Sequence, residues 1–474
     1  MHAVNGEHRG YILKSFNFKN LCDLRVLVIH SELETFVTET ANIRFTAQAG
    51  GSLKGQIRVP GDKSISHRSI MLGSIAEGVT EINGFLEGED SLATLKAFRA
   101  MGVAIEGPKD GKVTVHGVGL HGLKAPSEPL DLGNSGTSMR LLSGLLAGQA
   151  FDVEVVGDHS LMSRPMRRVT EPLAKMGAQI GATEKGTAPL KITGGHALQG
   201  ISYAMPVASA QVKSCLLLAG LYASGRTCVQ EPAPTRDHTE RMLSGMGYPV
   251  SSQGGKVCLE GGGRLTATTI DVPADISSAA FFLVGASIAP GSDLLLEHVG
   301  INPTRTGVLE ILKLMGADIE IRHQREVGGE PVADLRVRSA QLHGIDIPLT
   351  QVPLAIDEFP VLFIAAACAQ GRTLLTGAAE LRVKESDRIQ VMADGLQALG
   401  IQAEPTEDGM MIHGGRLSAG RVDSKGDHRI AMSFAMAALR AQGPINIDDC
   451  ANVNTSFPGF VDLSSAIGLR IETN

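Results

Sequence analysis

The stretch TRTGVLEILKLMGADIE (304–320) decides the fold, because its pattern recurs along the chain. Residues Thr304–Met315 place apolar side chains three and four apart, which predicts an amphipathic helix. Gly316 then stands where a helix end favours a left-handed residue, and a β-type segment follows. Similar settings surround Gly102, Gly177, Gly247, Gly316, Gly400 and Gly468, which lie 75, 70, 69, 84 and 68 residues apart. A period near seventy residues indicates that one unit has been copied six times.

Each unit also contains a second, more apolar and Ala-rich stretch. These stretches are Ser69–Ala76, Met139–Ala147, Cys215–Tyr222, Ala279–Ser287, Val361–Ala369 and Ile430–Leu439. A helix that is apolar on nearly every side belongs inside a core. Five of them run into a glycine-bearing turn and a β-like segment. Each unit is therefore predicted as β-α-β-α with an extra strand, one helix buried and one covering, in a layered α/β or α+β fold.

The polar segments that precede the buried helices differ from unit to unit. They read GDKSISHRS (61–69), LGNSGTSMR (132–140), VASAQVKS (207–214), PADISSA (273–279), AIDEFP (355–360) and KGDHRIA (425–431). Helix N-termini attract anions, so a cluster of such starts predicts an anion site. Ordinary capping by Ser, Asp and Asn is the alternative, and we favour it for PADISSA. Capping alone requires neither Lys63 with Arg68, nor Lys213, nor His428 with Arg429.

Composition narrows the class of protein. A chain of 474 residues with 43% hydrophobic content is expected to form two domains. A net charge of −7, no Trp and four Tyr disfavour nucleic-acid binding. The six cysteines lack CxxC spacing, which predicts reduced thiols in a cytoplasmic protein. No His and Cys spacing indicates a metal site, and no apolar run reaches membrane-spanning length.

Residues 1–45 stand apart from the repeat. They contain one short apolar run, LRVLVIH, and several acidic residues, which argue against a signal or transit peptide. We expect either a poorly ordered extension or a start site assigned too far upstream.

Charged residues recur at special places in the repeats. Ser64 and Arg68 lie four apart on one predicted helix, and Lys384 and Arg388 repeat that spacing in RVKESDR. A solvated, salt-bridged helix face is the commoner outcome for a charge run. Here further arginines stand at Arg164, Arg236 and Arg429, and Arg suits the bidentate binding of carboxylate and phosphate. The carboxylates Asp357 and Glu385 lie among these cations as candidate bases.

Several of these segments carry a close resemblance to a known family. GDKSISHR, LGNSGTSMR, SRPM, SAQVKS, RVKESDR, DHRIAM and SFPGF resemble, in this order, the motifs of the EPSP synthases, from about residue 46 to the C-terminus. The resemblance implies a two-domain inside-out α/β barrel with six βαβαββ units, three per domain. It implies a discontinuous domain of residues 46–61 plus 274–474 and an inserted domain of residues 62–273.

The resemblance also implies transfer of the enolpyruvyl group of phosphoenolpyruvate to the 5-hydroxyl of shikimate 3-phosphate, with release of phosphate. Asp357, Glu385 and Lys63 would be catalytic, with Asp357 as the base. The residues that would bind shikimate 3-phosphate are Lys63, Ser64, Arg68, Ser209, Ala210, Gln211, Asp357 and Lys384. Those that would bind phosphoenolpyruvate are Lys63, Gly136, Arg164, Gln211, Arg388 and Arg429. No metal or organic cofactor, membrane or nucleic acid is implied, and we expect a cytoplasmic monomer that closes around its anionic substrates.

The sequence also departs from the best-known family pattern. Ala210 stands where many members have serine, Glu380 where many have asparagine, and Thr455 where many have lysine. Arg236 lies near a position often filled by serine or tyrosine, which predicts a different phosphate contact. These features resemble the glyphosate-tolerant subclass, whose tolerant members can have alanine at the position of Gly136. We therefore expect glyphosate to compete with phosphoenolpyruvate here.

Three alternatives remain open at this point. The related transferase that acts on UDP-N-acetylglucosamine usually has a reactive Cys before its Arg-Pro pair, and GDHSLMSRP (157–165) has none. RNA 3′-phosphate cyclases share part of the fold, but an acidic chain with few aromatics fits them poorly. A non-catalytic binding protein would be expected to lose Lys63, Asp357, Glu385 or Arg388, and all four are present.

Overall fold

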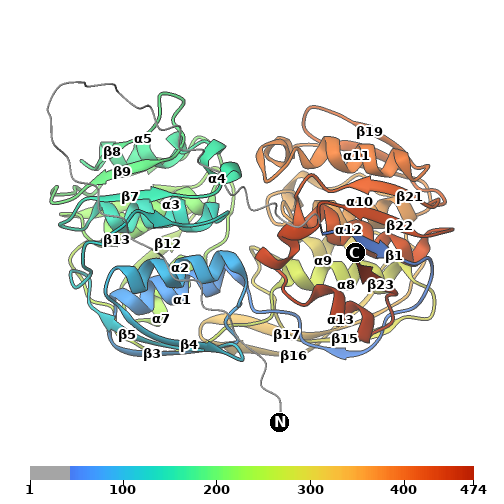
Figure 1. The fold of residues 1–474 in the computed structure, drawn as a ribbon, viewed down its shortest axis with the longest axis horizontal. Helices are drawn as coiled ribbons and strands as arrows, with labels where there is room; N and C mark the ends of the chain where they lie inside the picture. Colours follow the sequence, from blue (N-terminus) through green and yellow to red (C-terminus); the bar gives the residue numbers. More distant parts are fainter. Residues whose placement is uncertain (1–42) are drawn as a thin grey trace, which may run out of the picture. The chain divides into compact units, whose positions relative to one another are not determined.

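The computed structural model describes residues 43–474, which form a mixed α/β structure (Figure 1). The elements between residues 63 and 271 are α1 (Lys63–Ile75), β3 (Glu77–Asn83), α2 (Glu89–Ala100), β4 (Ala104–Lys109), β5 (Lys112–Val118), β6 (Leu130–Asp131), α3 (Gly136–Ala147), β7 (Val153–Val156), α4 (His159–Ser163), α5 (Arg167–Lys175), β8 (Gln179–Gly181), β9 (Leu190–Thr193), β10 (Ser202–Ala204), α6 (Ala210–Gly220), β11 (Arg226–Gln230), α7 (His238–Gly245), β12 (Val250–Gln253), β13 (Lys256–Glu260) and β14 (Thr269–Asp271). The others are β1 (Phe45–Ala47), β2 (Lys54–Ile57), α8 (Ile276–Ile288), β15 (Asp293–Gly300), α9 (Gly307–Leu314), β16 (Asp318–Val327), β17 (Glu330–Arg338), η1 (Leu349–Gln351), α10 (Phe359–Cys368), β18 (Arg372–Leu375), η2 (Ala379–Val383), α11 (Arg388–Ala398), β19 (Gln402–Pro405), β20 (Met410–His413), β21 (Gly420–Asp423), α12 (His428–Ala437), η3 (Ala438–Arg440), β22 (Ile445–Asp448), η4 (Ala451–Thr455), α13 (Phe460–Ala466) and β23 (Ile471–Thr473).

The strands of the described residues form six small sheets, one for each predicted repeat. In one sheet β6 pairs in parallel with β7, and β9 joins β7 and β8 in antiparallel fashion. The helix α3 connects the parallel pair, and α5 precedes the antiparallel hairpin. This order is β-α-β-α-β-β, as the repeat pattern predicts. β1 instead inserts between β22 and β23, which lie more than 390 residues away along the chain (Figure 1).

The six glycines that define the repeat end six helices. Each has a positive φ, between 80° for Gly247 and 117° for Gly468, which favours a residue without a Cβ. After each glycine, the next residue donates its backbone N–H to a carbonyl five residues earlier, as Ala317 does to Leu312 at 2.9 Å. This is the Schellman arrangement that closes a helix C-terminus. The prediction for these positions is confirmed.

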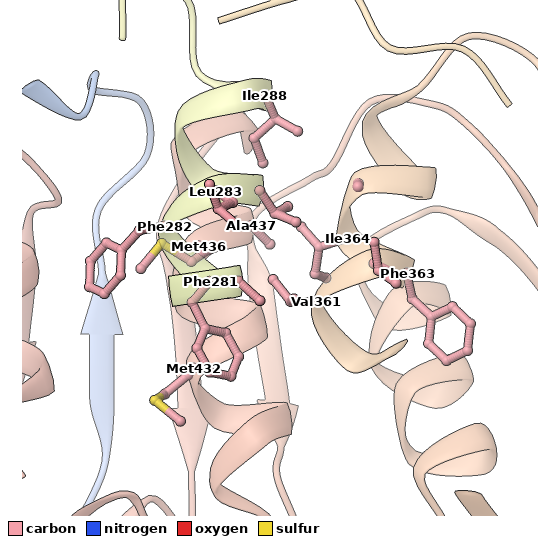
Figure 2. Packing of buried hydrophobic residues seen from close by; sticks show 14 of the residues in the cluster. Phe281, Phe282, Leu283, Ile288, Val361, Phe363, Ile364, Met432, Met436 and Ala437 are labelled. Carbon is pink, nitrogen blue, oxygen red and sulfur yellow. The ribbon is translucent and has the colours of Figure 1, made fainter. Parts of the chain in front are cut away.

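The Ala-rich helices are buried, as predicted, and pack in two groups. α8, α10 and α12 contact one another, with Ile364 and Ala437 among the side chains between them (Figure 2). α3 lies against both α1 and α6 in the second group. Two separate hydrophobic clusters result, one from residues 45–59 and 274–471 and the other from residues 65–272.

Two chain segments cross between these clusters. Residues 60–62 run beside residues 273–275: Asp62 donates its N–H to the Pro273 carbonyl at 2.8 Å, and Asp275 donates to Pro60 at 2.9 Å. Beside the crossings, β2 pairs with β15 within the first cluster and β14 pairs with β3 within the second. The predicted domain limits at residues 62 and 273 fall on these segments. β1 begins at Phe45, the last residue of the predicted extension.

The cysteine prediction is wrong for one pair. Cys228 in β11 and Cys258 in β13 form a disulfide. They lie directly opposite each other in the antiparallel register, a relation that a separation of 30 residues conceals in the sequence. Cys215, Cys368 and Cys450 are free thiols, and Cys22 lies outside the described residues. Within residues 43–474, no helix is long and apolar enough to cross a membrane.

Candidate active site

Asp357, one residue before Glu358 at the start of α10, is surrounded by cations. Its Oδ1 lies 3.2 Å from Lys384 Nζ and 3.4 Å from Arg388 Nη1, and its Oδ2 pairs with Arg236. Arg429 at the start of α12 donates to the Asp357 backbone carbonyl at 3.1 Å. We call these five residues the substrate cluster. Four of them were predicted site residues, and Arg236 was predicted only as an unusual phosphate contact.

The cations set the charge of Asp357. Burial raises the pKa of this carboxyl, but Lys384, Arg236, Arg429 and Arg388 together hold it well below its usual value. The group is therefore an ionised carboxylate at neutral pH. A carboxylate in this state is a poor base until something compensates the surrounding positive charge.

Arg388 holds the second predicted catalytic carboxylate. Its Nη2 donates to Glu385 at 2.6 Å and its Nε to Asp427 at 2.8 Å, and the Arg388 side chain is only 1% exposed. Burial raises the pKa of Glu385, and Arg388, His428 and Arg164 outweigh this and hold it well below its usual value. The prediction that Lys384 and Arg388 share one helix face is wrong. α11 begins at Arg388, with Lys384 extended before it, because the Asp387 side chain caps the helix there.

Lys63 begins α1 and stands beside a different carboxylate. Its Nζ pairs with Asp90 of α2 and donates to Ser456 Oγ at 2.8 Å. Ser456 Oγ lies 3.2 Å from His428 Nε2. Burial, with Lys63 and Arg429, holds the pKa of His428 well below its usual value, so its imidazole is neutral near pH 7. The ammonium thus connects α1, α2 and the loop before α13.

The other predicted shikimate 3-phosphate residues lie on α1 and α6. Arg68 donates to Thr239 at 2.6 Å, to Ser214 at 2.7 Å and to the Ser64 carbonyl at 3.0 Å. Burial lowers the pKa of Arg68 to about 10, so this arginine stays charged. Ser209 caps α6 by accepting from the Val212 N–H, and Ala210 is the first residue of that helix.

The remaining predicted phosphoenolpyruvate residues surround the start of α3. Arg164 donates to Asn134 Oδ1 at 2.6 Å, and Gln211 bridges Arg140 at 2.6 Å and Thr137 at 3.0 Å. Gly136 is the first residue of α3, and a Cβ there would lie 3.1 Å from both Arg140 Nη1 and Arg164 Nη1. The glycine therefore leaves room beside two guanidinium groups.

Cations outnumber carboxylates in the site. The cations are Lys63, Arg68, Arg164, Arg236, Lys384, Arg388 and Arg429, and the carboxylates that contact them are Asp90, Asp357, Glu358, Glu385 and Asp427. The starts of α1, α3, α6 and α12 add partial positive charge. Such an arrangement binds anions and stabilises negative charge, and its carboxylates can transfer protons.

Sequence reasoning missed three contributors to the site. Asp90, Ser456 and Asp427 contact Lys63 or Arg388 directly, yet none was predicted. Asp427 had a local signal, since it precedes the helix of KGDHRIA as a cap. Asp90 and Ser456 had none, because their partner Lys63 lies 27 residues away from Asp90 and 393 from Ser456.

Known proteins resemble this chain over most of its length. The pattern of the EPSP synthase (3-phosphoshikimate 1-carboxyvinyltransferase) family matches residues 47–463. A 3-phosphoshikimate 1-carboxyvinyltransferase of Methylococcus capsulatus is 72% identical over 433 residues, which cover 91% of this chain and 99% of the relative. Another from Alkalilimnicola ehrlichii is 70% identical, with coverage of 90% and 96%.

Solved structures agree with these relatives. The EPSP synthase of Acinetobacter baumannii matches with a TM-score of 0.84 and 61% identity, and covers 91% of this chain and all of its own. The enolpyruvyl transferase NikO of Streptomyces tendae has a TM-score of 0.73 at 15% identity, which shows a shared fold. The predicted inside-out two-domain α/β fold is confirmed.

Proposed function

Because this chain belongs to the EPSP synthase (3-phosphoshikimate 1-carboxyvinyltransferase) family, we propose that it transfers the enolpyruvyl group of phosphoenolpyruvate to the 5-hydroxyl of shikimate 3-phosphate. The products are 5-enolpyruvylshikimate 3-phosphate and inorganic phosphate. The observation that supports this most directly is the substrate cluster, in which three cations contact the Asp357 carboxylate and Arg429 donates to its backbone carbonyl. Each substrate carries a carboxylate and a phosphate of about −1.5 to −2 charge at pH 7.

Two groups of residues divide the binding of the substrates. Shikimate 3-phosphate contacts Lys63, Ser64, Arg68, Ser209, Ala210, Gln211, Asp357 and Lys384, with Arg236 as a further phosphate contact. Phosphoenolpyruvate contacts Lys63, Gly136, Arg164, Gln211, Arg388 and Arg429. The guanidinium groups suit the forked geometry of carboxylate and phosphate.

Asp357 takes the proton of the 5-hydroxyl as that oxygen attacks C2 of phosphoenolpyruvate. Glu385 and Lys63 handle the proton at the methylene carbon, which is added in the first step and removed when phosphate leaves. In the free protein, the cations hold the pKa of Asp357 well below its usual value. Bound phosphate and carboxylate groups neutralise these cations, so the pKa of Asp357 rises toward the range of a working base. Substrate binding thus prepares the base.

The cations of the site are divided between the two domains, which supports closure of the domains around the substrates. One domain comprises residues 46–61 and 274–474, and the other comprises residues 62–273. Lys63, Arg68 and Arg164 precede residue 273, whereas Lys384, Arg388 and Arg429 follow it. Anionic substrates relieve the repulsion between these two sets. Small-angle scattering should show compaction when shikimate 3-phosphate is added, and an unchanged radius of gyration would contradict this step.

The protein acts as a monomer in the cytoplasm. The residues assigned to the two substrates contact one another within one chain, which supports a monomeric site. Both substrates are strongly charged metabolites that do not cross a lipid bilayer unaided. Light scattering checks the mass, and a dimer at micromolar concentration would contradict the monomer.

The reaction is tested by phosphate release from phosphoenolpyruvate. Shikimate 3-phosphate should support turnover, and UDP-N-acetylglucosamine should not. Turnover with UDP-N-acetylglucosamine alone would assign the chain to the related transferase instead. Absence of turnover with both acceptors, in a protein that binds shikimate 3-phosphate, would favour the non-catalytic alternative.

A further inference from the structure

A buried ionic group joins the two crossing segments, and none of its residues is assigned to a substrate. Arg305 Nη1 donates to Asp62 at 3.0 Å, and Nη2 donates to Asp275 at 3.0 Å and to Ser277 Oγ at 2.6 Å. Glu358 Oε1 lies 4.0 Å from the same Nη2 and accepts from Ser277. We call Arg305, Asp62, Asp275, Ser277 and Glu358 the crossover cluster.

Each carboxylate of the crossover cluster lies at a helix start. Asp62 caps α1 by accepting from the Ile65 N–H at 2.9 Å, and Asp275 caps α8 by accepting from the Ser277 N–H at 2.9 Å. Glu358 occupies the N-cap position of α10 without a side-chain cap. One guanidinium group therefore connects the starts of three buried helices, α8 and α10 of the first hydrophobic cluster and α1 of the second.

The charges of the cluster fit this geometry. Three carboxylates face one arginine, and the Arg305 side chain is 3% exposed. The N-termini of three helices add about half an elementary charge each, and Arg429 lies 3.8 Å from Glu358. A lysine could not replace this arginine fully, because only the planar fork reaches Asp62 and Asp275 at the same time.

Two residues of the crossover cluster are sequence neighbours of proposed catalytic residues. Lys63 follows Asp62 directly, and its backbone N–H lies 3.4 Å from Asp275 Oδ2. Asp357 precedes Glu358, and Arg429 Nη1 lies 3.8 Å from Glu358 Oε1. A shift of α1 relative to α10 would therefore move the Lys63 ammonium relative to the Asp357 carboxylate.

We propose that Arg305 is a positioning residue for the transfer reaction, which fixes Lys63 against Asp357 by tying the starts of α1, α8 and α10 at the crossing. This inference rests on the proposed function. The alternative is that Arg305 only stabilises the fold. The positioning role and the purely stabilising role predict different turnover in molecules that remain folded. If Arg305 positions Lys63, its loss lowers turnover, because a displacement of about 1 Å can lower turnover roughly 100-fold.

The test compares Arg305→Lys and Arg305→Met with the matched control Arg336→Met. Arg336 is also paired with an aspartate, Asp293, but on the surface. Thermal unfolding fixes the folded fraction at the assay temperature, and kcat is expressed per folded molecule. We expect a fall in kcat of roughly 100-fold for Arg305→Met, a smaller fall for Arg305→Lys, and none for Arg336→Met. The Kd of shikimate 3-phosphate, measured by calorimetry, should change less than kcat, because Arg68, Ser209 and Gln211 lie outside the cluster.

Ser277→Ala covers the case in which Arg305→Met does not fold. This change keeps every charge and removes only the hydroxyl between Arg305 and Glu358. Lower kcat at nearly unchanged melting temperature supports positioning. Wild-type kcat in folded Arg305→Lys and Ser277→Ala overturns it. An inactive wild-type protein would instead contradict the proposed function, so the two failures are distinguishable.

Discussion

The substrate cluster and the crossover cluster are built from the same groups in opposite proportions. Around Asp357, three cations contact one carboxylate and a fourth donates to its backbone carbonyl. Around Arg305, three carboxylates face one cation, and helix starts complete the balance. Both regions are ionic and mostly buried, so burial of charge does not by itself identify a functional site. The sign of the surplus charge distinguishes them. Surplus positive charge favours the binding of an anion, whereas Asp62 and Asp275 already accept hydrogen bonds from the helix starts that they cap and from Arg305.

The largest effect expected from this comparison comes from removing the carboxylate of the substrate cluster. Asp357→Ala should lower kcat by about 10²- to 10⁴-fold, the usual contribution of a general base. Phosphate release with both substrates measures it. Asp293→Ala, which removes a carboxylate paired with Arg336 on the surface, is the control and should keep wild-type turnover. Near-normal turnover of Asp357→Ala would remove its role as base.

The pH dependence separates the free protein from the complex. The pKa of Asp357 is depressed in the free protein, and activity through the ionised form is lost as pH falls below that pKa. Bound anions raise this pKa, so the acid limb of kcat should lie at higher pH than the acid limb of kcat/KM, by about one unit or more. Steady-state kinetics across pH 4 to 8 check this. If the acid limbs of kcat and kcat/KM lie at the same pH, the bound substrates do not neutralise the cations around Asp357.

Gly136→Ala adds one methyl group beside the guanidinium groups at the start of α3. The Cβ would stand 3.1 Å from Arg140 and Arg164, so both guanidinium groups must move. Overpacking of this kind costs about 1–3 kcal/mol, which predicts a KM for phosphoenolpyruvate raised roughly 10-fold at nearly constant kcat. Glyphosate should compete with phosphoenolpyruvate in the wild type and more weakly in the variant. If millimolar glyphosate does not compete with phosphoenolpyruvate in the wild type, the prediction of glyphosate binding at this site is wrong.

The smallest effect is expected for an ion pair that belongs to neither cluster. Arg168 and Glu380 pair at 3.0 Å between α5 and η2, with side chains 31% and 33% exposed. Water screens such a pair, so Glu380→Gln should lower the free energy of unfolding by about 0.2–1 kcal/mol. Urea denaturation measures it, at two salt concentrations. A loss of about 3 kcal/mol or more, the usual cost of breaking a buried ion pair, would show that exposure does not separate the buried clusters from surface pairs.

The sequence by itself determined the repeated scaffold. The helical and β periods, and the glycines at 102, 177, 247, 316, 400 and 468, are local signals, because a helix end and its left-handed residue are set by a few neighbouring dihedrals. The helix starts were readable for the same reason, since capping groups act within three residues. These starts also contained Lys63, Asp357 and Arg429, which is why most of the candidate site could be predicted.

Tertiary structure alone decided which distant groups meet. Arg236 reaches Asp357 across 121 residues, Arg305 reaches Asp62 across 243, and Lys63 reaches Ser456 across 393. Cys228 and Cys258 face each other only because β11 and β13 are neighbours in one sheet. Such contacts leave no trace in local periodicity, since they depend on how packed helices and strands place their ends. Composition and spacing predicted a site for anions, whereas the balance of charge within it was set by the packing of the six repeats.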